Sequence, residues 1–203
     1  MLHYETVSPE LLELLKFLMA QPELSEFNLV GGTSLALQMG HRISVDIDLF
    51  GHQELDDIDI QGILAEFGES TLIKKSKSIQ IFSTTSIKTD FVNYRYPLLD
   101  TPLSIDHIRL ASMRDIAAMK LNAIAGRGSK KDFIDLFYLL NSFSLVDMIF
   151  FYKKKYTDGS EFLVTKSLCY FLDADLEETP ILLQPITWEE VKARILTETN
   201  KLI

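Results

Sequence analysis

The stretch that most constrains the fold of this chain runs over residues 28–51, NLVGGTSLALQMGHRISVDIDLFG. A short apolar segment leads into Gly31 and Gly32, and a two-turn helical pattern over residues 34–39 is followed by Gly40, a typical helix terminator. Residues 45–50 then alternate between apolar and acidic side chains, which is the period of a strand with one packed face. The stretch therefore predicts a strand, a glycine turn, a short helix and a second strand.

Asp46 and Asp48 are two residues apart on the second predicted strand, so their side chains are expected on the same face. Two carboxylates roughly 6–7 Å apart at Cα can converge on a hard cation such as Mg²⁺, which prefers oxygen ligands. Val45, Ile47 and Leu49 are expected to face the core. The alternative is the solvent-facing side of an ordinary strand, although aspartate is depleted in strands.

The glycine pair offers a second kind of site next to these carboxylates. Gly31, Gly32, Thr33 and Ser34 close one strand and open a helix, where exposed backbone N–H groups can bind an anion such as a phosphate. A tight turn with a hydroxyl helix cap is the alternative. A phosphate site and a carboxylate pair in one short unit are together more specific than either one alone.

The rest of the chain predicts an α+β protein. Segments 70–74, 78–84 and 87–94 have strand patterns, and their short connections require a partly antiparallel sheet. After Pro102 the periodicity becomes helical, in segments 112–125, 130–142, 144–156, 161–172 and 187–202. We therefore predict a small mixed-sheet core in residues 1–104 and a helical domain in residues 105–203.

Composition excludes several classes of protein. The formal net charge of −9 disfavours a long duplex nucleic-acid groove, although Lys74, Lys75 and Lys77 form a local basic cluster. No apolar run approaches the ~20 residues of a membrane-spanning helix, and no signal-peptide pattern is present. Zinc spacing, a P-loop and a dinucleotide fingerprint are also absent. We expect a cytoplasmic protein with no membrane partner.

Two motifs resemble a known family. GGTS followed by HRISVDIDLF is similar to the metal and phosphate motif of the DNA polymerase β nucleotidyltransferase superfamily, and more narrowly to the AbiEii/AbiGii-type toxins. The resemblance continues at DIAAMKLNAIAGRGSKKDFIDLFYLL, so it covers roughly residues 28–140. It implies a polymerase β-like core, two Mg²⁺ ions on Asp46 and Asp48, Asp90 as a third metal ligand, and Arg42 near a phosphate.

The second motif contains a lysine and two acids on consecutive predicted helices. Lys120 lies on one stripe with Ala117 and Ile124, where a lysine is costly unless it snorkels or meets an anion. The resemblance implies that Lys120 contacts the NTP triphosphate. It also implies that Asp135 is catalytic or holds Lys120 or an arginine, whereas Asp132, in the first helical turn, is interpreted as a helix-dipole partner.

The resemblance further implies a toxin of a toxin–antitoxin or phage-defence pair, with a cognate antitoxin as partner. The expected reaction moves a nucleotide from an NTP onto an RNA, such as a tRNA end, or onto a protein, with the base held between the two units. Two alternatives remain: a non-catalytic nucleotide-binding or protein-interaction module, and an enzyme that modifies a small molecule. Phosphorylation of Ser44, two residues before Asp46, would add negative charge beside the metal.

Overall fold

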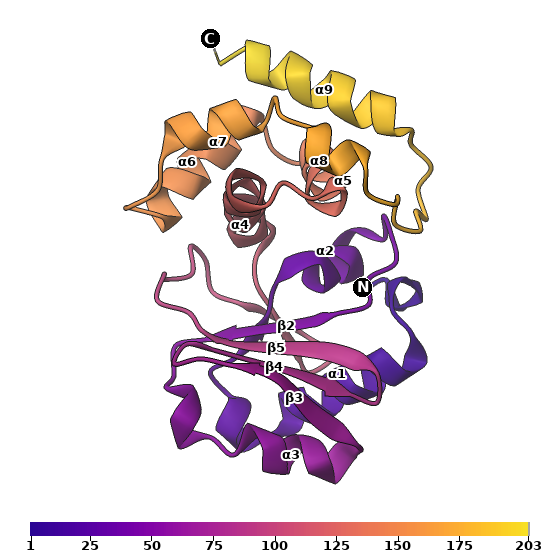
Figure 1. Cartoon of the computed structure of the whole chain (residues 1–203), viewed down its shortest axis with the longest axis vertical. Coiled ribbons are helices and arrows are strands. Elements are labelled where there is room, and N and C mark those ends of the chain that lie inside the picture. Colours follow the sequence, from indigo (N-terminus) through magenta and orange to yellow (C-terminus); the bar gives the residue numbers. More distant parts are fainter. Residues whose placement is uncertain (203) are drawn as a thin grey trace. The chain divides into compact units, whose positions relative to one another are not determined.

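The glycine turn and the acidic strand lie in a seven-stranded mixed sheet (Figure 1). The computed structural model describes residues 1–202 and divides into two units by internal contacts. The sheet unit contains Met1–Pro97 and Thr101–Ala111, and the helical unit contains Leu98–Asp100 and the chain from Ser112 onward. No helix within residues 1–202 is long and apolar enough to cross a membrane.

The sheet has the strand order β3-β4-β5-β2-β1-β7-β6. Its strands are β1 (Asn28–Leu29), β2 (Ile47–Gly51), β3 (Ser70–Lys75), β4 (Ile79–Thr84), β5 (Ile87–Asn93), β6 (Leu103–Ile105) and β7 (Ile108–Leu110). The pairs β2–β5 and β1–β7 are parallel, and the other neighbours are antiparallel. The predicted mixed sheet and the α+β class are confirmed.

The sheet contains two tight hairpins, one inside it (β4–β5) and one at an edge (β6–β7). Thr85 and Ser86 join β4 to β5 and both have positive φ, 47° and 71°, as a two-residue turn of the primed type requires. Asp106 and His107 join β6 to β7 in the same way, with φ of 51° and 65°. The second hairpin was not predicted, because its strands are three residues long and follow a proline-containing loop.

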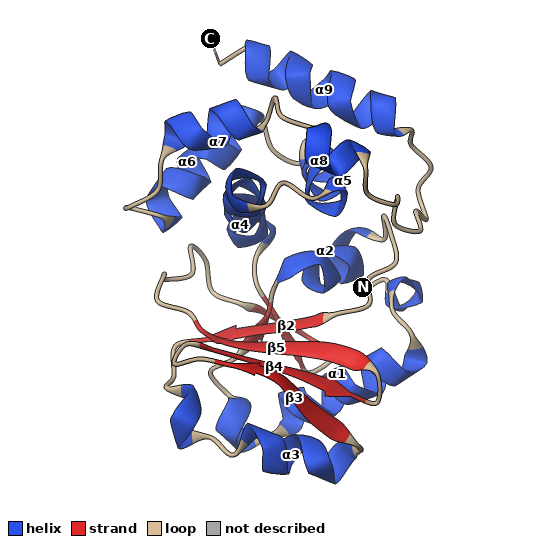
Figure 2. Ribbon diagram, in the orientation of Figure 1, coloured by secondary structure: helices blue, strands red, loops and turns tan. Residues whose placement is uncertain are grey.

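Helices of the sheet unit lie on both sides of the sheet. They are α1 (Pro9–Ala20), α2 (Gly31–Met39) and α3 (Ile60–Phe67), with short 3₁₀ turns at Tyr4–Thr6, Pro22–Leu24 and Leu55–Asp57. Figure 2 shows α1 and α3 on one side and α2 on the other. The core between the sheet and α1 and α3 includes Leu14, Leu18, Leu49, Leu64 and Phe91, each 0–1% exposed.

Local sequence signals explain where these helices begin and end. The Ser8 hydroxyl accepts a hydrogen bond from the Leu11 N–H at 3.1 Å, and Pro9 occupies the first turn of α1. The Asp59 carboxylate caps α3 through the Gly62 N–H at 2.9 Å. Gly40 ends α2 with a left-handed φ of 66°. These caps were all readable from the sequence.

The helical unit is built around α4 (Met113–Gly126), which packs against α5, α6 and α7. The other helices are α5 (Lys130–Leu139), α6 (Leu145–Lys155), α7 (Glu161–Ser167), α8 (Leu172–Asp175) and α9 (Trp188–Asn200). The predicted helix over residues 161–172 is thus a shorter helix followed by a separate turn of helix. The other four predicted helices are present within a few residues.

A buried ion pair fastens the start of the helical unit. Lys155 Nζ lies 2.7 Å from Asp115 Oδ1, and both side chains have no exposed surface. Burial lowers the pKa of Lys155, and Asp115 opposes that shift. Asp115 also accepts from the backbone N–H groups of Leu99 and Asp100 at 2.8 and 3.3 Å. These bonds explain why residues 98–100 belong to the helical unit.

The boundary between the units differs in position from the predicted one at residue 105. The contacts divide the chain after Ala111, because β6 and β7 belong to the sheet. Ser112 then caps α4, accepting from the Asp115 N–H at 3.1 Å. The change from sheet to helix therefore falls at a capping residue.

Candidate functional site

Asp48 lies in the middle of the sheet, on the face opposite the α1–α3 core. Its neighbours Ile47 and Leu49 are 0% and 1% exposed, so they occupy the core side of β2 and Asp48 occupies the other side. Asp90 is the residue paired with Asp48 on the parallel strand β5. The two carboxylates thus originate from adjacent positions on one face of the sheet.

Asp46 lies one residue before β2 begins, so the predicted strand starts two residues later than expected. The Asp46 carbonyl oxygen accepts a hydrogen bond from the Thr33 hydroxyl, which ties this segment to α2. Val45 is 66% exposed, so the prediction that it faces the core is wrong. The strand period does not extend to Val45, because the backbone there is held by α2 rather than by a neighbouring strand.

The glycine pair begins α2 directly, three residues before the predicted start of the helix. Gly31 has a left-handed φ of 68°, and a Cβ atom at this residue would collide with Asp48 Oδ2. Val30 precedes the helix and provides no side-chain cap. Asp48 therefore lies against the first residue of a helix N-terminus, where backbone N–H groups favour negative charge.

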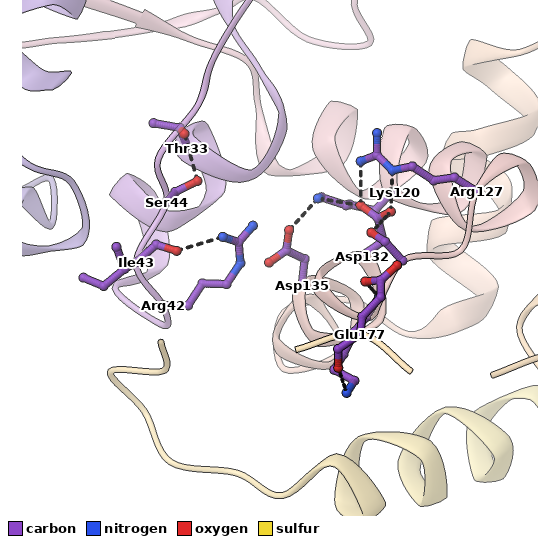
Figure 3. Close-up of polar contacts among 11 residues, drawn as sticks. Thr33, Arg42, Ile43, Ser44, Lys120, Arg127, Asp132, Asp135 and Glu177 are labelled. Atoms are coloured by element: carbon purple, nitrogen blue, oxygen red, sulfur yellow. Dashed lines mark hydrogen bonds and ion pairs between the residues drawn. The ribbon is translucent and has the colours of Figure 1, made fainter. Parts of the chain in front are cut away.

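Arg42 occupies the space over the second glycine. A Cβ atom at Gly32 would collide with an Arg42 guanidinium nitrogen and would lie 3.4 Å from Ser44 Oγ. Arg42 is 3% exposed, and its Nη1 donates to the Ile43 carbonyl oxygen at 2.9 Å (Figure 3). Both glycines are thus required by the close approach of a charged side chain.

The hydroxyl groups of the turn are engaged in internal hydrogen bonds. Thr33 Oγ1 lies 2.9 Å from Ser44 Oγ, and Ser34 Oγ accepts from Gln38 Nε2 at 3.1 Å. The predicted phosphate contact of this turn therefore depends on its backbone N–H groups more than on its hydroxyls. Ser44 is 6% exposed, so its modification requires this segment to open first.

Asp90 is already paired with a cation from its own strand. Lys88 Nζ lies 2.5 Å from Asp90 Oδ1, with 44% and 18% of the two side chains exposed. Within residues 1–202, no three or more His, Cys, Asp or Glu side chains are grouped so as to hold a metal. Oxygen donors at Asp46 and Asp48 fit the chemistry of Mg²⁺, whereas Asp90 has to leave Lys88 to join them.

A second charged cluster lies in the helical unit, on α4 and α5. Lys120 Nζ lies 2.5 Å from Asp135 Oδ2 and 3.1 Å from Asp132 Oδ1 (Figure 3). Both carboxylates are fully buried, and the Lys120 side chain is 5% exposed. The lysine on the apolar stripe therefore meets anions supplied by the chain itself. This arrangement matches the predicted alternative in which Asp135 holds Lys120.

Asp132 has a larger role than the predicted dipole partner. It accepts two hydrogen bonds from Arg127, at 2.9 and 3.0 Å, and one from the Ser129 hydroxyl at 2.8 Å. Burial alone would raise the pKa of Asp132, but Lys120, Arg127 and Ser129 outweigh it and lower the pKa to about 2. Sequence spacing placed Asp132 on the same face as Asp135, but it did not reveal that Lys120, Arg127 and Ser129 converge on Asp132.

Comparisons with known proteins identify the family of this chain. A family model described as "Nucleotidyl transferase AbiEii toxin, Type IV TA system" matches residues 13–199. The chain is 40% identical over 174 residues to the uncharacterized protein aq_aa25 of Aquifex aeolicus (strain VF5), covering 83% of this chain and 84% of that protein.

Solved structures share the fold at low sequence identity. JHP933 from Helicobacter pylori has a TM-score of 0.60 at 19% identity, over 95% of this chain and 88% of its own. The nucleotidyltransferase toxin MenT4 from Mycobacterium tuberculosis H37Rv has a TM-score of 0.58 at 15% identity, over 96% and 83%. The family match spans nearly the whole chain and includes both charged clusters. The chain therefore belongs to the AbiEii nucleotidyl transferase toxin family and is a nucleotidyltransferase.

Proposed function

We propose that this nucleotidyltransferase moves a nucleotide from an NTP onto an RNA acceptor, such as a tRNA end, in a reaction that depends on Mg²⁺. The observation that carries the proposal is the position of Asp48. It is paired in register with Asp90 on the neighbouring strand and lies against Gly31 at the start of α2. Carboxylates and helix N–H groups side by side are suited to a nucleotide triphosphate and its cation.

The N-terminus of α2 would receive the phosphates. The backbone N–H groups of Gly31, Gly32 and Thr33 are the first of a nine-residue helix and carry the positive end of its dipole. The Ser34 N–H, also predicted for this site, already donates to the Val30 carbonyl oxygen at 3.4 Å. Arg42 lies directly behind Gly32 and adds a formal positive charge to that end. Both features would stabilise the negative charge that develops on the leaving pyrophosphate.

Asp46 and Asp48 would hold Mg²⁺, with Asp90 as a third donor once it separates from Lys88. When bound, Mg²⁺ ions in such sites neutralise phosphate charge and favour loss of the acceptor hydroxyl proton. Other residues of the chain hold these carboxylates in place. Ile47 and Leu49 anchor β2 in the core, and Thr33 fastens the Asp46 backbone to α2.

Lys120 would assist the triphosphate, as the family motif implies, with Asp135 and Asp132 fixing its ammonium group. Two carboxylates within 2.5 and 3.1 Å hold the Lys120 ammonium group in one orientation. Lys120→Arg keeps the charge and changes the geometry. We expect it to lower kcat while leaving the protein folded, as circular dichroism would show.

The test is transfer of label from each of the four NTPs, with Mg²⁺, to total RNA, to total protein and to small molecules of a cell extract. Labelled RNA, lost in Asp46→Asn and Asp48→Asn, is the expected result. Asp57→Asn changes an exposed aspartate outside the site and is the matched control. Label on protein or on a small molecule alone would contradict the RNA acceptor, and no label on any of them would contradict the proposal as a whole.

The family places this chain among toxins of a toxin–antitoxin system, which implies an antitoxin partner. Co-expression with the product of the neighbouring gene is therefore expected to relieve any growth arrest that the native chain causes. Asp48→Asn should cause no arrest. Arrest by Asp48→Asn at equal expression would mean that toxicity does not require nucleotidyl transfer.

A further inference from the structure

The face of the sheet that carries Asp48 continues into a pair of aromatic rings. Phe50 follows Asp48 by two residues on β2 and therefore lies on the same face. Its ring centroid is 4.9 Å from that of Tyr94, which comes directly after β5. Tyr94 in turn makes an edge contact with Tyr96 at 5.5 Å. A row of aromatic rings thus begins two residues beyond Asp48, on the same face of the sheet.

A pocket lies at this end of β2 and β5. It has a volume of about 660 Å³. Its walls come from the residues after β2, from the β3–β4 turn and from the end of β5, all within the sheet unit: His52, Gln53, Glu54, Lys77, Ser78, Asn93, Tyr94 and Arg95. His52 Nδ1 lies 3.3 Å from the Tyr94 carbonyl oxygen, which joins two of these walls.

Two cations line the pocket of this acidic protein. Lys77 and Arg95 lie in its wall together with one acid, Glu54. Lys74 and Lys75 precede the pocket on β3, and Lys75 is ion-paired with Asp56 at 2.8 Å. The Arg95 guanidinium lies 4.6 Å from the centroid of the Tyr96 ring. The whole chain has a net charge of −9, so general attraction to polyanions is not expected. A local group of cations beside aromatic rings instead fits a ligand with both phosphates and flat bases.

We propose that this pocket binds a single-stranded segment of the acceptor RNA close to the end that receives the nucleotide. A base would stack on Tyr94, and Lys77 and Arg95 would bind the phosphates. The inference rests on the proposed function, because it takes RNA as the acceptor. It adds a binding site that is separate from the glycine turn and the carboxylates.

The position of the pocket predicts the length of the bound segment. His52 follows Asp48 by four residues, which is about 13 Å along an extended strand. Stacked nucleotides rise by about 3.4 Å each, so about four of them would extend from Asp48 to the pocket. Oligonucleotides shorter than this would reach the carboxylates or the pocket, but not both.

The test is binding of fluorescein-labelled single-stranded RNA of two to ten nucleotides to the full chain, without NTP or Mg²⁺, at several salt concentrations. Affinity is expected to rise steeply with length up to about four nucleotides. Tyr94→Ala should weaken binding by about 5- to 150-fold, which is the range for loss of one stacking platform. Tyr94→Phe, which keeps the ring, should bind like the native protein.

Charge variants test the phosphate contacts separately. Lys77→Gln and Arg95→Gln should each reduce the slope of log affinity against log salt by about 0.7, the value for one phosphate of a single strand. Tyr170→Ala and Lys166→Gln change exposed residues of the helical unit and are the matched controls. Native affinity and salt slope in Tyr94→Ala and Lys77→Gln would overturn the proposal.

The two proposals fail in different ways. If RNA is labelled and Asp48→Asn abolishes labelling, but Tyr94→Ala leaves KM for RNA and RNA affinity unchanged, the proposed function stands and the pocket assignment is wrong. If only protein becomes labelled and the native chain does not bind RNA, both the RNA acceptor and the pocket assignment are wrong. A higher KM for RNA with unchanged KM for NTP in Tyr94→Ala is the result that supports the pocket.

Discussion

Asp48 and Asp90 occupy paired positions on the parallel strands β2 and β5, yet Asp90 is also ion-paired with Lys88 at 2.5 Å. Lys88 precedes Asp90 by two residues and therefore lies on the same face of β5. The two aspartates thus differ in their surroundings: Asp48 lies against the N-terminus of α2, and Asp90 lies beside an ammonium group. This difference predicts unequal contributions to activity.

Asp48→Asn is expected to lower kcat by at least about 100-fold, as for loss of a group that stabilises transition-state charge. Asp90→Asn should lower it less, by about tenfold, because Lys88 already neutralises this carboxylate. Lys88→Gln should lower the Mg²⁺ concentration needed for half-maximal transfer, since the ammonium no longer competes for Asp90. Transfer rates measured against Mg²⁺ for the three variants check this ranking, and equal losses in both aspartate variants would contradict it.

Gly31→Ala is expected to lower the free energy of unfolding by more than about 1–2 kcal/mol, the cost of a left-handed conformation for an L-residue. The collision of its Cβ with Asp48 adds to this cost and should reduce transfer activity. Gly126→Ala is the matched control. It lies in α4, and an added Cβ meets nothing within 4 Å. That substitution should raise stability by about 0.4–1 kcal/mol, and urea unfolding measures both values.

The lowered pKa of Asp132 predicts that the protein loses stability in acid. Its pKa is about 2 in the folded protein, below the usual 3.8, so the unfolded chain takes up its proton first as pH falls. The contribution of Asp132 is complete above about pH 5 and is lost as pH falls toward 2; it amounts to roughly 2 kcal/mol. Arg127→Gln should reduce this dependence, whereas Asp173→Asn, at an exposed position, should not. Urea unfolding between pH 2 and 6 gives the profiles, and superimposable profiles for the native and Arg127→Gln proteins would contradict this assignment.

Lys155→Met is expected to lower the free energy of unfolding by about 3–5 kcal/mol, because it leaves the Asp115 carboxylate buried without its cation. Lys154→Met, at the exposed neighbouring position, should change it by less than about 0.5 kcal/mol. Asp115→Asn and the double variant complete a mutant cycle. A coupling free energy near zero in that cycle would show that the two side chains contribute independently.

The sequence by itself determined the features that depend only on residues close together along the chain. The capping residues Ser8 and Ser112, the left-handed Gly40 and the alternation of Ile47, Asp48 and Leu49 all follow from local conformational preference and period. The family motif is also made of residues that are consecutive in the chain, so residues of both charged clusters were named from the sequence. Among the pairings, only that of Lys120 with Asp135 was predicted, and then as one of several alternatives.

Only the tertiary structure decided those pairings, because they join residues that are far apart along the chain or belong to different elements. Lys120 meets Asp135 and Asp132 across two helices, and Lys155 meets Asp115 across 40 residues. The short strands β6 and β7 exist because the sheet supplies partners for their backbone groups. Val45 belongs to the alternating sequence pattern but is exposed, because β2 begins only at Ile47 and the pattern does not predict where a strand begins.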